Sequence, residues 1–131
     1  MARRNVGSSV TIWLNEAKFR EMEKAQIRAL EQTAEALHKE VQQAEIMPRD
    51  GGALQNEKTF VDTSYSKAGK VSIVTEGPYA RRLYFHPEYH FQTYENAFAQ
   101  GKWYQPWIDG ISRNFAQEAF TKNMRREMRN I

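Results

Sequence analysis

The sequence has 131 residues, no cysteine and a formal net charge of +3. This length fits one domain, which we expect to span residues 1–131 with an ordered core at about 10–125. The lack of cysteine excludes disulfide bonds, thiolate zinc ligands and cysteine nucleophiles. No apolar run reaches the ~20 residues that a membrane-spanning helix needs, so we expect an unexported protein made in the cytoplasm, without a membrane partner.

The first predicted element is a short strand at residues 10–14, where β-branched and bulky apolar residues alternate. Asn15 is suited to cap a following helix, and Glu16 is favoured in its first turn. An apolar stripe predicts a long amphipathic helix from Asn15 to Ile46, about 48 Å in length at 1.5 Å per residue. A helix this long exceeds what one small domain covers, so part of its stripe should pack on a sheet and part should meet a partner. The stripe consists of Ile27, Leu30, Ala34, Leu37, Val41 and Ala44.

The middle of the chain predicts a loop and a hairpin. Pro48 and the glycines at 51 and 52 should end the helix and open a loop that runs to about residue 57. Two runs rich in β-formers, Thr59–Tyr65 and Lys70–Thr75, predict a small antiparallel sheet joined at residues 66–69. Residues 80–85 fit either a third strand or a short helical turn, and periodicity leaves both open, although the alternating rings favour a strand.

The last third of the chain is rich in aromatic residues. Residues 79–107 hold ten of the sixteen aromatic side chains without a clean period, and we expect this aromatic-rich loop to pack down on the sheet. Ser112 is a plausible N-cap for a C-terminal helix whose basic end covers residues 121–131. The predicted fold class is therefore α+β, with a long N-terminal helix packed on a small antiparallel sheet.

Two histidines and a glutamate, His86, Glu88 and His90, are the strongest candidates for a metal site or for acid–base chemistry. Their spacing would align the histidines on a helix, but Pro87 argues against a helix there. The sequence has no nucleophile motif, no phosphate-binding glycine loop and no HExxH pattern. A small hydrolase or toxin would depend on these three residues alone, so we expect a protein that is not an enzyme and has no cofactor or metal.

Basic and aromatic clusters define the candidate contact residues. The sequence pI is about 9.2, and arginines lie near rings at 79–85 and along the end of the last helix. Such clusters are typical of proteins that bind single-stranded nucleic acid. The same arginines could instead be solvent-exposed residues at the edge of an apolar surface, or cations that stabilise the C-terminus of a helix. Large rings are either core anchors or interface hot spots. The interface candidates are Tyr79, Arg81, Arg82, Tyr84, Phe85, Trp103, Tyr104 and Trp107, and the candidate DNA or partner contacts are Arg125, Arg126 and Arg129.

The order of these signals resembles the small minor capsid proteins of long-tailed bacteriophages, and more broadly their head-to-tail joining (tail-completion) proteins. The resemblance covers about residues 10–125. It depends on the helix, the turn at Pro48 and Asp50, the hairpin, the motif GPYARRLYF and the later motif WYQPWIDG before a basic helix. Where the family commonly has a glycine after the aromatic pair, this chain has His86-Pro87-Glu88.

The resemblance implies an α+β fold and a structural role without catalysis. It implies a ring-like homo-oligomer in the neck of the virion, where the protein would contact portal or adaptor proteins, tail proteins and the packaged DNA. The alternative that the residues leave open is a basic nucleic-acid-binding accessory protein.

Overall fold

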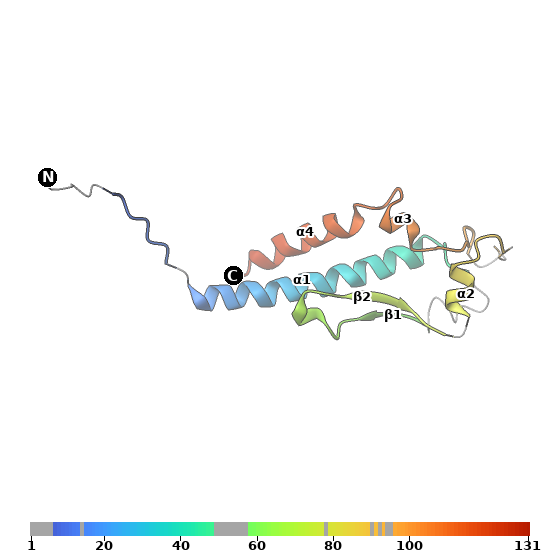
Figure 1. Ribbon diagram of the computed structural model, residues 1–131, viewed down its shortest axis with the longest axis horizontal. Coiled ribbons are helices and arrows are strands. Elements are labelled where there is room, and N and C mark those ends of the chain that lie inside the picture. The colour runs from blue at the N-terminus through green and yellow to red at the C-terminus, as the bar shows by residue number, and fades with distance from the viewer. Residues whose placement is uncertain are drawn as a thin grey trace.

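The computed structural model describes residues 7–13, 15–48, 58–77, 79–89, 91, 93 and 96–131. It confirms the α+β class. Helix α1 forms the long axis of the molecule, with α4 along one side, the β1–β2 hairpin along the other and α2 near its C-terminal end (Figure 1). In chain order the elements are α1 (Glu16–Gln43), β1 (Thr59–Asp62), the 3₁₀ turn η2 (Ser66–Ala68), β2 (Ser72–Thr75), α2 (Ala80–Tyr84), α3 (Gln105–Ile108) and α4 (Phe115–Met128).

Helix α1 begins where its capping residue predicts. The side chain of Asn15 accepts a hydrogen bond from the backbone N–H of Lys18 at 3.2 Å, which satisfies one of the free donors of the first turn. The helix ends at Gln43, three residues before the predicted end at Ile46. Glu45 takes a left-handed backbone conformation (φ 52°), which stops the helix before the proline can. The predicted loop at 49–57 lies outside the described residues.

The predicted strand at 10–14 is wrong for the residues that the structure describes. Residues 10–13 have no regular secondary structure, and Leu14 lies outside the described residues. Residues 7–13 extend away from the start of α1, and both α4 and the hairpin lie farther along that helix (Figure 1). A single extended segment has no neighbour to complete its backbone hydrogen bonds, so alternation alone does not make it a strand. Its apolar side chains remain in solvent.

The predicted hairpin is confirmed, with shorter strands. β1 pairs antiparallel with β2, and Thr59 lies opposite Thr75 with their hydroxyl oxygens 3.0 Å apart. The strands end early because residues 63–70 form a turn. In it the backbone N–H and hydroxyl of Ser64 donate to Asp62, and Gly69 closes η2 with a φ of 85°. This sheet has two strands, and residues 80–84 are the short helix α2 rather than a third strand.

Helix α4 is the main neighbour of α1, and the two helices run antiparallel. The expectation that α1 packs chiefly on a sheet is therefore incomplete. Four of the five buried residues of α1 are small, which lets a second helix approach closely. They are Ala25, Ala29, Thr33 and Ala34.

Polar side chains join the two helices. Glu127 accepts a hydrogen bond from Arg28 at 3.0 Å and another from Gln32 at 3.0 Å. The amide of Asn123 donates to the hydroxyl of Thr33 at 3.2 Å. Arg126 completes the network, since it donates to the Gln32 side chain at 3.1 Å and to the Asn123 side-chain oxygen at 2.8 Å. The contact between α1 and α4 is thus specified largely by hydrogen bonds.

This network predicts a pH dependence. The hydrogen bond from Arg28, and then that from Gln32, lowers the pKa of Glu127 in the folded protein. A carboxyl group whose pKa is lowered on folding stabilises the fold above its unfolded pKa, near 4.3, and that stabilisation is lost as the pH falls through the folded pKa. We expect Glu127→Gln to reduce the loss of stability below about pH 4.3, measured by urea unfolding at several pH values. An unchanged pH profile would contradict the network.

The hydrophobic core lies at the C-terminal end of α1. Its buried residues are Val41, Ile46, Met47 and Trp103, and five partly buried residues pack against them: Ala44, Leu83, Tyr84, Tyr104 and Trp107. The segment 96–102 is held to this end by backbone hydrogen bonds from residues 98, 100 and 102 to the carbonyls of residues 45, 46 and 84. The side chain of Asn96, which is buried, also donates to the Met47 carbonyl at 2.8 Å.

The start of the last helix differs from the prediction. Helix α4 begins at Phe115 with Asn114 at its N-cap position, and the N-cap side chain makes no capping hydrogen bond. Ser112 instead belongs to the preceding turn, where its backbone N–H donates to the carbonyl of Pro106 at 2.9 Å. Because α3 ends only a few residues earlier, the chain needs this turn to reverse onto α1.

Candidate interaction surface

The aromatic residues predicted as core or interface fall into both groups. Trp103 is buried, and the ring of Tyr84 packs edge-on against it at 4.8 Å between centroids. The Tyr104 ring lies 6.0 Å from Tyr84, and its hydroxyl makes a short hydrogen bond with the hydroxyl of Thr75 on β2. Burial raises the pKa of the hydroxyl groups of both tyrosines. This half of the aromatic set, together with Trp107, builds the core and joins it to the hairpin.

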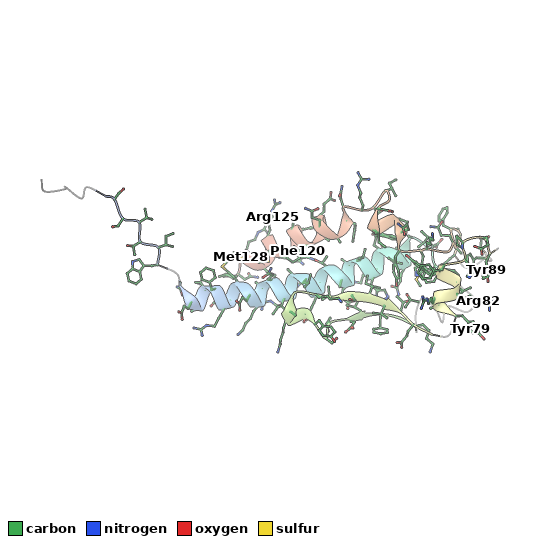
Figure 2. All side chains as sticks on the ribbon, in the orientation of Figure 1. Tyr79, Arg82, Tyr89, Phe120, Arg125 and Met128 are labelled. Atoms are coloured by element: carbon green, nitrogen blue, oxygen red, sulfur yellow. The ribbon has the colours of Figure 1, made fainter. Side chains whose placement is uncertain are left out.

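The other aromatic residues face solvent at the end of the molecule that carries α2. Tyr79 and Phe85 are exposed, at 67% and 59% of their full areas. Arg82 donates to the hydroxyl of Tyr89 at 3.2 Å, with its guanidinium carbon 6.0 Å from the centre of that ring. Arg81 is also exposed. Figure 2 shows Tyr79, Arg82 and Tyr89 at this end, where they form a basic and aromatic surface.

Of the three residues considered for a metal site or for catalysis, the structure describes two, and these two contact each other. His86 lies 2.7 Å from Glu88, a contact that lowers the pKa of the glutamate, and the His86 ring stacks on Tyr89 at 4.8 Å. His90 lies outside the described residues. Within the described residues, no three or more histidine, aspartate or glutamate side chains converge in a way that could hold a metal ion.

The basic end of α4 divides into two kinds of residue. Arg126 belongs to the network with α1, as described above. Arg125 and Arg129 instead line an open groove of about 570 Å³ together with Thr121. The apolar side of the groove is a row of three residues one turn apart on α4, which we call the α4 ridge: Phe120, Met124 and Met128. Figure 2 shows Phe120, Arg125 and Met128 on this helix.

The side of α4 that faces α1 is unusually polar. Its one buried residue is Asn123, and the Glu127 side chain is only 12% exposed, because both face α1. In the α4 ridge Phe120 and Met124 are half-buried, and Phe120 lines a pocket with Ile27 and Leu30 of α1. Met128, at the end of the ridge, is 38% exposed. The sequence places Phe115, Ala119, Phe120 and Met124 on one face of this helix by their spacing. Periodicity could not show that small residues and hydrogen bonds would occupy the α1 side.

The balance of apolar surface is unusual over the whole described part of the chain. The buried hydrophobic residues number eight, and four of them are alanine. Twelve larger apolar or aromatic side chains are exposed, including Val10 (85%), Trp13 (90%) and Ile111 (97%). Single exposed apolar residues are ordinary, but contiguous groups mark contact sites. Residues 7–13 form one such group, and the partly exposed α4 ridge, with Met128 at its open end, is a second apolar surface. Neither was among the predicted site residues.

A scan against protein-family models and searches of curated proteins and of solved structures found no match. Among the residues that the structure describes, no helix is both long and apolar enough to cross a membrane.

Proposed function

We propose that this chain is a non-enzymatic structural component of a phage particle, a minor capsid or head-to-tail connector protein that joins the capsid to the tail as part of a ring. The observation that carries the proposal is the excess of exposed apolar side chains over buried ones on an elongated molecule. A chain that keeps a tryptophan and several aliphatic side chains in solvent gains most by burying them against other proteins.

The location in the virion neck depends on the motifs of the sequence. GPYARRLYF and WYQPWIDG occur in the order and context seen in minor capsid and joining proteins, and their residues form α2, α3 and the core that connects them. The partners proposed on this basis are the portal or adaptor proteins on the capsid side, the tail proteins, and further copies of this chain. The protein would then be located in the neck of the virion.

Two surfaces suit such contacts at opposite ends of the molecule. The α2 end presents Tyr79, Arg81, Arg82 and Phe85, and the other end presents the α4 ridge and residues 7–13 (Figure 2). A subunit of a connector must contact neighbours on more than one side, and separated surfaces meet that requirement. The alternative, a basic nucleic-acid-binding protein, is supported less well. Arg126 is engaged in the α1–α4 network, so a DNA contact on α4 would depend on Arg125 and Arg129.

The test is to remove the protein from assembling particles. With a stop codon early in its gene, electron microscopy should show filled heads and separate tails, and purified wild-type protein added to them should restore joined particles. A chain with both Tyr79→Ser and Phe85→Ser should restore joining less well, because it lacks exposed rings at the α2 end. The control is Tyr65→Ser, an equally exposed ring in the hairpin turn. Joined, infectious particles made without the protein would contradict the proposal.

A further inference from the structure

Residues 7–13 form an apolar segment that has no surface to cover in its own chain. Val10, Ile12 and Trp13 are 85%, 75% and 90% exposed, and the segment is directed away from α4 (Figure 1). Every residue from Gly7 to Trp13 is uncharged. A segment without charged side chains has no charge to desolvate when it docks. Burial of its three large apolar side chains is favourable in free energy. It therefore has the composition of a docking peptide.

The α4 ridge is a surface of matching size and character. Phe120 and Met128 are eight residues apart, which corresponds to about 12 Å along a helix. The stretch from Val10 to Trp13 spans about 10 Å when extended, and all of residues 7–13 can span about 20 Å. The segment is thus long enough to cover the whole ridge. The start of α1 and the end of α4 also lie at the same end of the molecule (Figure 1).

The charges beside the ridge also suit this segment. Arg125 and Arg129 line the groove. An extended peptide presents backbone carbonyls that guanidinium groups can bind, and an indole ring such as that of Trp13 attracts a cation to its face.

We propose that residues 7–13 of one copy dock on the α4 ridge of a second copy. This inference rests on the self-assembly part of the proposed function and names its contact. Each copy offers one segment and one ridge, so a copy that donates its segment to one neighbour still has a free ridge for another. A contact of this head-to-tail kind closes into a ring when the rotation per subunit allows it.

Cross-linking between two different chains tests the contact directly, because the protein has no cysteine of its own. One chain carries Ile12→Cys, and a second chain of different mass carries Met128→Cys. A disulfide forms only where the two Cβ atoms come within about 3.5–4.5 Å. The control pair replaces the second chain by Ile111→Cys, a site that is 97% exposed. We expect at least tenfold more mixed disulfide from the first pair than from the control.

Self-association of the purified chain gives an independent readout. Val10, Ile12 and Trp13 replaced together by serine should weaken association at least tenfold, measured by analytical ultracentrifugation. Folding should be unaffected, because these side chains are exposed in the single copy. Met128→Ser should act in the same direction from the ridge side. Phe98→Ser, at a ring that is 69% exposed and belongs to neither group, should leave association unchanged.

The outcomes separate this inference from the proposed function. Equal disulfide yields from the two pairs would overturn docking on a second copy. A chain that carries both Ile12→Cys and Met128→Cys and forms the disulfide only within itself would overturn it as well. A wild-type chain that stays monomeric at every concentration reached would also overturn it. If the serine variants associate as strongly as wild type, this inference is wrong. The proposed ring could still be correct, and the experiment on particles would still test it.

Discussion

Replacement of Trp103 by alanine is expected to lower the free energy of unfolding by about 3–5 kcal/mol, the largest effect that we expect of a single truncation among the described residues. Trp103 is 1% exposed and is the largest fully buried side chain among the described residues. It contacts the end of α1 and packs against Tyr84. Truncation would leave a cavity between elements that the rest of a small core cannot refill. Urea unfolding followed by circular dichroism measures the change.

Trp13→Ala is the matched control, because it makes the same chemical change at a side chain that is 90% exposed. At a concentration where the protein is monomeric, this variant should unfold within about 0.5 kcal/mol of wild type. The comparison separates loss of a core residue from loss of a tryptophan. Similar destabilisation in the two variants would mean that the core does not centre on Trp103.

Replacement of Gly101 by alanine is expected to destabilise the protein by about 1–3 kcal/mol, as overpacking of a tight site does. A Cβ atom at this position would lie 2.8 Å from the Cα of Pro87 and 3.1 Å from the carbonyl oxygen of Leu83. Both are backbone atoms, so no side chain can turn aside to relieve the contact. The segment before Trp103 would have to move, and the 2.8 Å hydrogen bond from Lys102 to the Tyr84 carbonyl would weaken.

The control for this variant is Gly69→Ala in the hairpin turn. No atom lies within 4 Å of a Cβ built at Gly69, but its φ of 85° is unfavourable for alanine. Its cost, about 1–2 kcal/mol, comes from the backbone alone and should leave the Trp103 environment unchanged. Near-ultraviolet circular dichroism should therefore change in Gly101→Ala and stay as in wild type in Gly69→Ala. A Gly101→Ala protein with wild-type stability and spectrum would contradict the close approach of Pro87.

The assembly that we propose would explain both the exposed apolar surface and the polar α1–α4 contact. In the helix pair joined by Arg28, Gln32, Asn123 and Glu127, the polar side chains occupy part of the contact. Met128, at the end of the α4 ridge, is left exposed. In a subunit that assembles with further copies, apolar area left uncovered in the single copy is the area that drives association.

Local signals in the sequence predicted local structure. Asn15 caps α1 because its side chain reaches a backbone N–H three residues later, and this interaction needs nothing from the rest of the chain. The hairpin follows in the same way from β-branched runs on both sides of a short turn closed by Gly69. The α+β class could therefore be inferred before the structure was known.

Contacts between distant segments governed the features that sequence reasoning missed. Val10 and Ile12 have the alternation of a strand but no neighbouring strand, and Met128 has helical spacing but is 38% exposed. The rings at 84 and 103 are buried while the adjacent ring at 85 is not, because only the folded chain brings residues 41–47 against one side of α2. Periodicity reports which residues share a face. Which face is buried depends on partners that are far away in the sequence or belong to another molecule.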